Sequence, residues 1–465
     1  MKLHSGHILA FLFACTLSSI SLTEVRKNMF GTDGIRATVG NSPFTAPDLH
    51  NIGLAVGTWI VNTYGENATV LIGHDTRLSC SFVKSSLKSG LLMHPICLID
   101  AGVLPTPAVV QLALTHTAVD CGIIISASHN PFQDNGIKII DGTKGKISAQ
   151  DEQTITDLFF NAQPSTNYAQ LGEEHFWNNA QKAYVDHINK FFAPDFLKGK
   201  KIVLDCANGA AYTLAPLIFK QFGAEVITVA NEPNGKNINV ESGAVHPEML
   251  QKAVITHHAD AGFAFDGDAD RVIAVNASGD VRDGDDILAM LLDHPLYRNS
   301  TVLVGTIMTN KGLESWLAAK NCMLFRTPVG DKYISRKLCK DNLLIGGEQS
   351  GHIILNDYLP TGDGIFTALR VMEVIMHTGN AGMQTFTRFP QILINVPIHN
   401  KKDLTQEPFA SMLKLREEEL SNGRLVVRYS GTESILRIMI ENEDKAQAEM
   451  IGRALATELQ LALQG

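Results

Sequence analysis

The sequence predicts an α/β fold of three similar α/β domains with mixed sheets and a smaller C-terminal α+β domain, arranged around a central cleft. Three observations lead to this prediction. The chain has 465 residues, which is more than a single hydrophobic core accommodates. Apolar strand signals alternate with helical stretches along most of the chain, which is typical of βαβ units and of parallel or mixed sheets. From about Phe389 onward the pattern changes to strand signals followed by a terminal helix.

Each of the three repeating units begins with an apolar strand and ends a strand at a polar loop. In the first unit the predicted strands and helices are 70–72, 82–93, 98–99, 107–114 and 123–125. In the second unit they are 201–205, 214–222 and 225–229, and in the third 301–304, 313–319 and 343–345. The C-terminal strands are 392–398, 425–427 and 436–440. Because ligands bind at the carboxyl ends of strands in open α/β sheets, we expect the polar loops to face one cleft.

These units set the predicted domain boundaries. Residues 1–28 are a leader or an over-extended start, and residues 29–170 form the first domain, which carries a serine loop. The second, third and fourth domains are expected at 171–277, 278–388 and 389–465. They carry, in that order, an aspartate loop, a glycine-rich polar loop and a Ser-Gly-Thr loop.

The serine loop directly follows the apolar run GIII at residues 122–125. The chain continues as SASHNP, residues 126–131, whose small and polar residues must turn at the end of the strand. Ser128 followed by His129 suits a nucleophile or a carrier of a phosphate group. A Ser-His pair taken alone is usually part of an ordinary polar loop, so the other motifs decide between the two interpretations.

Three aspartates recur at every second position of FAFDGDADR, residues 263–271. In an extended segment Asp266, Asp268 and Asp270 point to the same side, and three carboxylates there repel each other unless a hard cation lies between them. Oxygen ligands suit Mg²⁺. A calcium EF-hand starting at Asp266 needs glycine at its sixth position and glutamate at its twelfth, where this chain has Arg271 and Ala277. The apolar runs on both sides speak against a solvated acidic turn.

Two further loops carry groups that suit a phosphorylated sugar. RYSGTESILR, residues 428–437, places small and hydroxyl residues between two arginines, a combination that can surround an anion. GGEQSGH, residues 346–352, places an acid, an amide, a hydroxyl and an imidazole in one glycine-rich turn. Each of these signals is weak alone, since both kinds of turn are common without a ligand.

Taken in order, these motifs resemble those of the α-D-phosphohexomutase superfamily. The resemblance runs from FGTDGIR at Phe30 to the SGTE loop and beyond, which is nearly the whole chain after Met29. GIIISASHNPFQDNGIK and GGEQSGH are more similar to the branch that acts on glucosamine phosphates than to the mannose and glucose branch. The resemblance implies an intramolecular phosphotransferase of the isomerase class. It would interconvert glucosamine 6-phosphate and glucosamine 1-phosphate for amino-sugar precursors of the cell wall.

The resemblance also implies how the phosphate moves. Ser128 is the phosphorylated residue, which donates its phosphate to the free sugar hydroxyl and is regenerated from glucosamine 1,6-bisphosphate. One Mg²⁺ is held by Asp266, Asp268, Asp270 and an oxygen of phospho-Ser128.

Proton transfer and substrate binding have their own candidates. Lys138 and His129 are candidates for proton transfer, and Arg36 for stabilising the transferring phosphoryl group. Lys138 as a solvated loop lysine, and His129 as a residue that only positions the serine loop, stay open as alternatives. The resemblance assigns the sugar and the non-transferring phosphate to Glu348, Ser350, Arg428, Ser430, Gly431, Thr432 and Arg437.

The composition narrows the choice of partners. A net charge of −9 argues against broad nucleic-acid binding, because no basic surplus neutralises a polyanion. We expect a small-molecule sugar phosphate as partner, no nucleic acid and no stable membrane association, and the resemblance implies a homodimer. The positive site for phosphate would come from Arg36, Arg77, Lys138, Arg428 and Arg437. Seven scattered cysteines form neither a metal spacing nor a disulfide framework, which fits a reducing compartment.

The N-terminus carries a signal-like segment. An apolar run at residues 8–17 follows Lys2, with the charge and length of a secretory h-region and too short to span a membrane. FGTDGIR lies close to the start in the family, and Met29 immediately precedes it. We therefore expect a cytoplasmic protein, with secretion as the lesser alternative.

Two other functions stay open at this point. One is phosphomutase chemistry on glucose or mannose phosphates, against which the form of GGEQSGH argues. The other is a regulator that binds a sugar phosphate without turnover. Intact Ser128 and all three aspartates argue against the regulator, since a protein without turnover needs neither.

Overall fold

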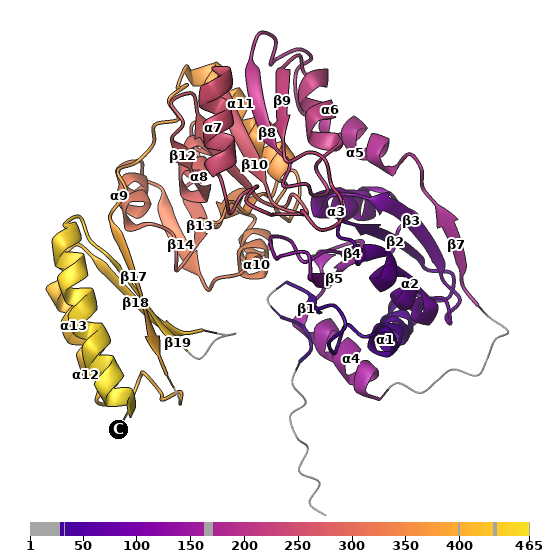
Figure 1. Cartoon of the computed structure of the whole chain (residues 1–465), viewed down its shortest axis with the longest axis horizontal. Coiled ribbons are helices and arrows are strands. Elements are labelled where there is room, and N and C mark those ends of the chain that lie inside the picture. The colour runs from indigo at the N-terminus through magenta and orange to yellow at the C-terminus, as the bar shows by residue number, and fades with distance from the viewer. Residues whose placement is uncertain (1–27, 32, 162–170, 399, 431–434, 465) are drawn as a thin grey trace, which may run out of the picture.

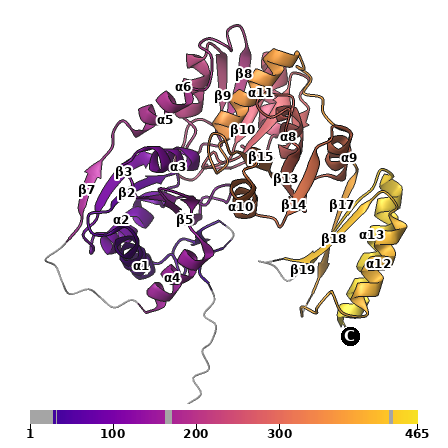
Figure 2. The ribbon, with the colours of Figure 1, turned by 180° about the vertical axis from the view of Figure 1, so that it is seen from behind.

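The computed structural model describes residues 28–31, 33–161, 171–398, 400–430 and 435–464. Four sheets follow one another in chain order, and each has its own helices. Figure 1 shows the four sheets along an arc, from the indigo first sheet to the yellow fourth sheet. Figure 2 shows the same arc from behind, with the first and fourth sheets at its two ends.

The first sheet has the order β1-β5-β4-β2-β3-β7, with β6 paired to β5. Its strands are β1 (Ile35–Thr38), β2 (Thr69–His74), β3 (Cys97–Val103), β4 (Cys121–Ile125), β5 (Asp134–Asp141), β6 (Gly145–Lys146) and β7 (Glu173–Phe176). Strands β4, β2, β3 and β7 are parallel, whereas β5 is antiparallel to both β4 and β1. The sheet is therefore mixed.

Helices cover both faces of the first sheet. They are α1 (Ala46–Tyr64), α2 (Cys80–Leu91), α3 (Thr106–Thr115), α4 (Ala149–Phe160) and α5 (Ala180–Ile188). Val70 and Ile72 of β2 pack into one core with α1, α2 and α4, and Leu71 packs into another core with α3 and α5. Successive residues of a strand face opposite sides of a sheet, so a strand covered on both faces is apolar throughout.

The second sheet has the order β12-β11-β10-β8-β9, in which β9, β8 and β10 are parallel and β11 is antiparallel. Its strands are β8 (Lys201–Asp205), β9 (Glu225–Val229), β10 (Ala261–Phe265), β11 (Val272–Asn276) and β12 (Val281–Arg282). Helices α6 (Leu214–Gln221) and α7 (Glu248–His257) contribute to different cores, on the Leu204 and the Val203 side of β8.

The third sheet has the order β14-β13-β15-β16, with β16 antiparallel to β15. Its strands are β13 (Val302–Thr306), β14 (Met323–Thr327), β15 (Ile345–Gly347) and β16 (Ile353–Leu355). The helices of this part are α8 (Gly284–Leu291), α9 (Lys311–Ala319), α10 (Asp331–Asp341) and α11 (Gly364–Thr378). Helix α11 also packs against β10 and β11, so it joins the second and third sheets.

The fourth sheet is antiparallel throughout, in the order β17-β19-β18. Its strands are β17 (Gln391–Pro397), β18 (Arg424–Tyr429) and β19 (Ile435–Glu441). Helices α12 (Phe409–Glu419) and α13 (Lys445–Gln464) share a core with it. None of the helices in the described part of the chain is long and apolar enough to cross a membrane.

One feature is common to the first three sheets. In each sheet, one strand is parallel to a neighbour on one side and is followed in the chain by an antiparallel strand on its other side. The connections between these two strands are β4–β5, β10–β11 and β15–β16. The serine loop, the aspartate loop and GGEQSGH are these three connections. The repeated topology therefore brings one polar loop from each sheet to the carboxyl end of a parallel strand.

The predicted α/β class and the mixed sheets are confirmed, and the structure adds elements that the pattern did not indicate. Residues 134–141 form strand β5, although NGIK follows a polar stretch that suggests a loop. Strand β14 and helix α10 occupy the interval between the last predicted helix and strand of the third unit. Strand β7 lies past residue 170, the predicted end of the first domain, yet it pairs with β3 of the first sheet.

Candidate active site

Ser128 lies in a strained and fully buried turn after β4. Its φ of +54° is in the left-handed region, which costs a residue with a side chain roughly 1 kcal/mol or more. The Ser128 amide donates to Ser126 Oγ at 2.9 Å, and the Ser126 hydroxyl donates to Asp75 Oδ2 at 2.6 Å. The Ser128 carbonyl accepts from Asn239 Nδ2 at 2.9 Å. This backbone geometry is therefore fixed by side chains from two sheets.

Arg77 holds the same turn in place through hydrogen bonds to its backbone carbonyls. Its side chain is fully buried, and Nε donates to Asp75 Oδ2 at 2.9 Å. The other guanidinium nitrogens donate to the carbonyls of Ser128 at 2.9 Å and Asn130 at 2.8 Å, and to those of Pro131 and Asp134. The sequence predicts Arg77 to be one of the cations available to phosphate. That prediction is wrong, because the protein's own backbone uses its donors.

The three aspartates occupy a turn and not the extended segment that their spacing suggests. The loop between β10 and β11 contains Ala269 at a φ of +57°, so the chain reverses within the motif. One carboxylate oxygen from each of Asp266, Asp268 and Asp270 nevertheless lies within 4.8 Å of the other two. The prediction that they gather on one side holds, for a different geometric reason.

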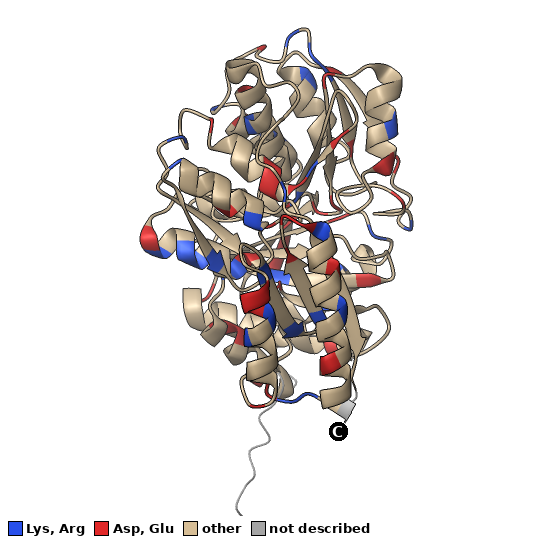
Figure 3. Ribbon diagram, turned by 90° about the vertical axis from the view of Figure 1, so that its left-hand side faces the viewer, with Lys and Arg blue, Asp and Glu red and all other residues tan. Residues whose placement is uncertain are grey.

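This carboxylate cluster has the properties of a cation site. All three side chains are buried, and Oδ1 of Asp268 and Oδ1 of Asp270 have no hydrogen-bond partner within the described residues. Burial, together with the nearby charges of Asp270 and Asp268, raises the pKa of Asp266 to about 8. Unpartnered buried oxygens and a carboxyl group that resists ionisation both fit a hard divalent cation. Figure 3 shows acidic loop segments gathered in the middle of the molecule.

The serine and aspartate loops meet directly. The Ser128 hydroxyl donates to Asp266 Oδ2 at 2.6 Å, and it lies 3.3 Å from His129 Nδ1. Gly267 permits this approach, because a Cβ at that position would lie 2.5 Å from the Ser128 carbonyl oxygen. Burial, together with the charges of Arg271 and Arg36, lowers the pKa of His129 to about 4, so the imidazole is neutral at pH 7.

Lys138 is a buried member of the cluster, which excludes the solvated loop lysine that the sequence left open. It lies on β5, and its Nζ is 2.8 Å from Asp268 Oδ2, 3.1 Å from Asp270 Oδ2 and 2.8 Å from Asp33 Oδ2. Burial alone would lower the pKa of its ammonium group, but the three carboxylates overcome this and raise the pKa well above the usual value. Lys138 is therefore fully protonated in this arrangement.

Arg36 lies at the edge of the same cluster, in strand β1. Its NH2 nitrogen is 2.6 Å from Asp33 Oδ2, and NH1 donates to the carbonyl of Ala127 at 3.3 Å. The guanidinium group thus contacts the serine loop through the carbonyl of Ala127. It retains partial exposure, with 22% of the side chain accessible, so a ligand can reach it.

The sugar-loop candidates lie in the turn between β15 and β16. Glu348 Oε1 accepts the amide of Gly330 at 2.9 Å, and Ser350 is exposed at the tip of the turn. His352, the last residue of the motif, lies with Nδ1 3.5 Å from Asp270 Oδ1. The Gly362 amide donates to Nε2 of this ring at 3.0 Å, so in the neutral imidazole the proton is on Nδ1, towards Asp270. The third loop therefore contacts the second.

The remaining candidates are on the fourth sheet. Arg428 of β18 and Arg437 of β19 are direct cross-strand partners, and burial followed by the charge of Arg437 lowers the pKa of Arg428. Two guanidinium groups opposite each other repel, and an anion relieves the repulsion. Ser430 is buried, and its carbonyl accepts from Lys401 Nζ at 3.3 Å. Gly431 and Thr432 lie outside the described residues.

Several residues at the site were not predicted from the sequence. Thr106 donates to Asp268 Oδ2 at 2.6 Å, and Arg271 Nε lies 3.8 Å from both Asp266 Oδ2 and Asp270 Oδ1. Arg271 and His352 could have been found, because they belong to the motifs DGDADR and GGEQSGH. No local signal marks Thr106, which reaches the cluster only through the packing of α3.

Four family models match the chain in order. The α/β/α domain I of phosphoglucomutase/phosphomannomutase matches residues 27–166, domain II residues 182–279, domain III residues 283–391 and the C-terminal domain residues 393–458. A phosphoglucosamine mutase of Verminephrobacter eiseniae is 40% identical over 444 residues, which cover 94% of this chain and 96% of the relative. A phosphoglucosamine mutase of Agrobacterium fabrum is 41% identical over 440 residues, covering 91% and 96%.

Solved structures share the fold. A phosphoglucomutase/phosphomannomutase family protein from Burkholderia thailandensis superimposes with a TM-score of 0.78 at 23% identity, covering 93% of this chain and 98% of the other. The N-acetylphosphoglucosamine mutase of Aspergillus fumigatus, solved in complex with GlcNAc-6P and magnesium, gives a TM-score of 0.63 at 16% identity, covering 93% and 96%.

The chain therefore belongs to the phosphoglucomutase/phosphomannomutase family of the α-D-phosphohexomutase superfamily. It is an enzyme of the mutase type, in the isomerase class, and the relatives that match it over nearly its whole length are named phosphoglucosamine mutase.

Replacing Arg77 by Met is expected to lower the Tm by roughly 10 °C, because it leaves Asp75 buried without a counter-charge. Arg77→Lys is expected to recover little, since an ammonium group cannot reproduce the guanidinium fork that serves several carbonyls. Differential scanning calorimetry measures both variants. A fall of only 1 or 2 °C for Arg77→Met would contradict the scaffold role of Arg77.

Asp268→Asn is expected to weaken Mg²⁺ binding by about tenfold or more, because one of three carboxylates loses its charge. Isothermal titration calorimetry with Mg²⁺ measures the affinity without depending on turnover. Asp205→Asn is the matched control, since Asp205 is equally buried at the end of β8 but accepts only backbone amides, from Ala207 and Gly243. Equal Mg²⁺ affinity in Asp268→Asn and the control would argue against the cation site.

Proposed function

We propose that this enzyme interconverts glucosamine 6-phosphate and glucosamine 1-phosphate through a phosphoserine at Ser128 and a glucosamine 1,6-bisphosphate intermediate. The observation that carries the proposal is the buried hydrogen bond from the Ser128 hydroxyl to Asp266, within a cluster of three carboxylates. A hydroxyl in that position suits a phosphate carrier whose charge must be balanced during transfer. The phosphoglucosamine mutase relatives support the choice of amino sugar.

The reaction needs two phosphoryl transfers in opposite directions. In the first, the bond between phosphorus and Ser128 Oγ breaks and a bond to the free sugar hydroxyl forms, which gives the bisphosphate. The bisphosphate then reorients in the site, so that its other phosphate faces Ser128. This phosphate passes back to Ser128 Oγ. The enzyme regains its phosphate and the sugar phosphate leaves as its isomer. The same bisphosphate, supplied from solution, would load unphosphorylated enzyme.

Each transfer moves one proton between an oxygen and the enzyme. Neutral His129, whose Nδ1 lies 3.3 Å from Ser128 Oγ, is the candidate for proton transfer by its position, whereas its pKa of about 4 makes it a weak base at pH 7. Lys138 is suited to give electrostatic support, since its carboxylate partners keep it protonated. Arg36, next to the serine loop and partly exposed, is suited to bind the transferring phosphoryl group.

Mg²⁺ would be held by the three aspartates of the cluster and an oxygen of phospho-Ser128. When bound, such an ion neutralises charge that develops on the phosphoryl oxygens. The contribution of the chain itself is a buried site whose carboxylates are already gathered, so that little reorganisation is needed.

The substrate would span the loops of two sheets. Glu348 and Ser350 of the third sheet are assigned to the sugar hydroxyls. The non-transferring phosphate is assigned to the fourth sheet, where Arg428 and Arg437 face each other, with Ser430, Gly431 and Thr432. A mobile fourth domain would let the bisphosphate reorient before the cleft closes again. The predicted homodimer stays a prediction.

We also propose a cytoplasmic location. The six cysteines in the described part of the chain are free thiols, most of them buried, as expected in a reducing compartment. An amino-sugar phosphate is a metabolite of that compartment, since charged phosphates do not cross membranes unaided.

Ser128→Ala is expected to lower turnover of glucosamine 6-phosphate by about a thousandfold or more, because the phosphate carrier is lost. Ser85→Ala, at an exposed position of α2, is the control and should keep wild-type activity. Production of glucosamine 1-phosphate measures both, and circular dichroism checks that the fold is retained. Substantial turnover in folded Ser128→Ala would refute the phosphoserine role.

A further inference from the structure

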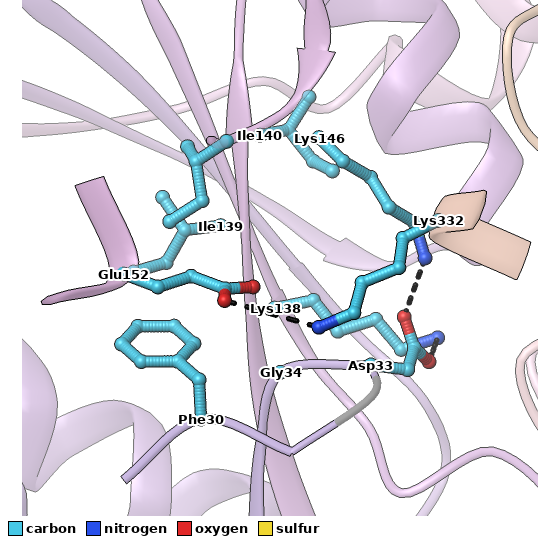
Figure 4. Close-up of a pocket in the computed structure, with 10 residues that line it drawn as sticks. Phe30, Asp33, Gly34, Lys138, Ile139, Ile140, Lys146, Glu152 and Lys332 are labelled. Atoms are coloured by element: carbon cyan, nitrogen blue, oxygen red, sulfur yellow. Dashed lines mark hydrogen bonds and ion pairs between the residues drawn. The ribbon is translucent and has the colours of Figure 1, made fainter. Parts of the chain in front are cut away.

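Two consecutive residues at the start of α10 reach from the third sheet's helices to the first sheet. Asp331 forms an ion pair with Lys146 of β6. Lys332 lies with Nζ 3.9 Å from Glu152 Oε2 of α4, and it donates to the carbonyl of Gly31 at 3.3 Å. Figure 4 shows Lys332 pointing to Glu152 and Lys146 pointing to Asp33, around a small pocket beside Lys138.

The Lys146–Asp331 pair belongs to a closed ring of six side chains. Lys146 Nζ is 2.7 Å from Asp33 Oδ1, and Asp33 Oδ2 is 2.8 Å from Lys138 Nζ. Lys138 Nζ continues to Asp270 Oδ2 at 3.1 Å. His352 lies between the two ends of this chain of contacts, with Nδ1 3.5 Å from Asp270 Oδ1 and Nε2 3.4 Å from Asp331 Oδ2, and it closes the ring by ion pairs when the imidazole is protonated.

The ring links the first sheet to the aspartate loop and to the GGEQSGH loop. Three members come from the first sheet and its loops, one from the aspartate loop and two from the third sheet and α10. Lys138, Asp270 and His352 are at most 5% exposed, and Asp331 is 9% exposed. Charges at this depth are weakly screened by solvent, so removing one member leaves its partner uncompensated.

The start of α10 also touches the sugar loop. Gly330, the residue that caps α10, donates its amide to Glu348 Oε1 at 2.9 Å. The position of Asp331 therefore fixes the position of the donor that orients Glu348. Lys146 lies outside the aspartate cluster and contacts neither Ser128 nor Glu348 in the described ion pairs and hydrogen bonds.

We propose that Lys146 and Asp331 are positioning residues, whose ion pair holds α10 and the sugar-binding Glu348 in register with the phosphoserine loop of the first sheet. This inference rests on the proposed function, because it concerns the placement of the same sugar. Misplacing a bound reactant by about 1 Å can lower the rate about a hundredfold. A pair remote from the reacting atoms can therefore control turnover through geometry alone.

The test is a double-mutant cycle of Lys146→Met, Asp331→Asn and the double variant, in the full chain with Mg²⁺. We expect each single variant to lower kcat/KM for glucosamine 6-phosphate by about tenfold to a hundredfold. The double variant should lose about as much as one single variant, because the pair is already broken. Mg²⁺ affinity from calorimetry should stay within about twofold of wild type, since neither residue is a proposed ligand.

Two further variants separate positioning from general stability. Lys146→Arg keeps the charge and should recover most of kcat/KM. Lys332→Met removes the neighbouring charge across the same interface, but outside the ring, and should leave kcat/KM within about twofold of wild type. Equal losses in Lys332→Met and Lys146→Met, or additive losses in the double variant, would overturn the proposal.

A second measurement does not depend on turnover. Hydrogen–deuterium exchange should be faster in α10 and in residues 345–352 of Lys146→Met than in wild type, with exchange in the fourth sheet unchanged. If wild-type enzyme turns over no hexosamine phosphate, the proposed function fails, and this exchange pattern still tests the register. Unchanged exchange in α10 would overturn the positioning role whatever the substrate.

Discussion

The candidate site depends above all on the ammonium group of Lys138. It contacts Asp33 from the first sheet's N-terminal loop and Asp268 and Asp270 from the second sheet. Each buried carboxylate carries a desolvation penalty of several kcal/mol, which only close opposite charges or a cation offset. Without Lys138 the aspartate loop would repel both itself and Asp33. Lys138, on an interior strand, thus contacts carboxylates of both loops and, with Arg271 and Lys146 beside it, allows them to share one buried space.

The fold supplies the loops, and the charges hold them together. In three successive sheets a parallel strand turns back into an antiparallel neighbour, and the turn carries the polar motif. Apolar packing on both faces of the sheets makes these turns the places where polar side chains concentrate. The strained φ of Ser128 persists because Arg77, Ser126 and Asn239 hold its backbone. Strain and buried charge therefore occur together at the residue proposed to carry phosphate.

The sequence predicts those features that are local. Continuous apolar runs identified β2, β4, β8, β10 and β13, since strands covered on both faces need apolar residues at every position. The aspartate spacing identified three side chains that do gather, although through the wrong geometry, because only the structure reveals the turn at Ala269. The sequence does not distinguish a buried Lys138 from a solvated loop lysine, since a polar stretch hides the start of β5. The contributions of Thr106 and Asn239 come from long-range packing, which no local pattern encodes.

The central claim is that this site isomerises an amino-sugar phosphate. Phosphorus NMR of the purified chain with Mg²⁺ and a trace of hexose bisphosphate tests it most directly, with glucosamine 6-phosphate and glucose 6-phosphate offered in parallel. Glucosamine 1-phosphate is expected to appear fast, and the glucose compound is expected to react much more slowly. Preference for glucose 6-phosphate, or no conversion of either sugar by enzyme that carries phosphate on Ser128, would contradict it.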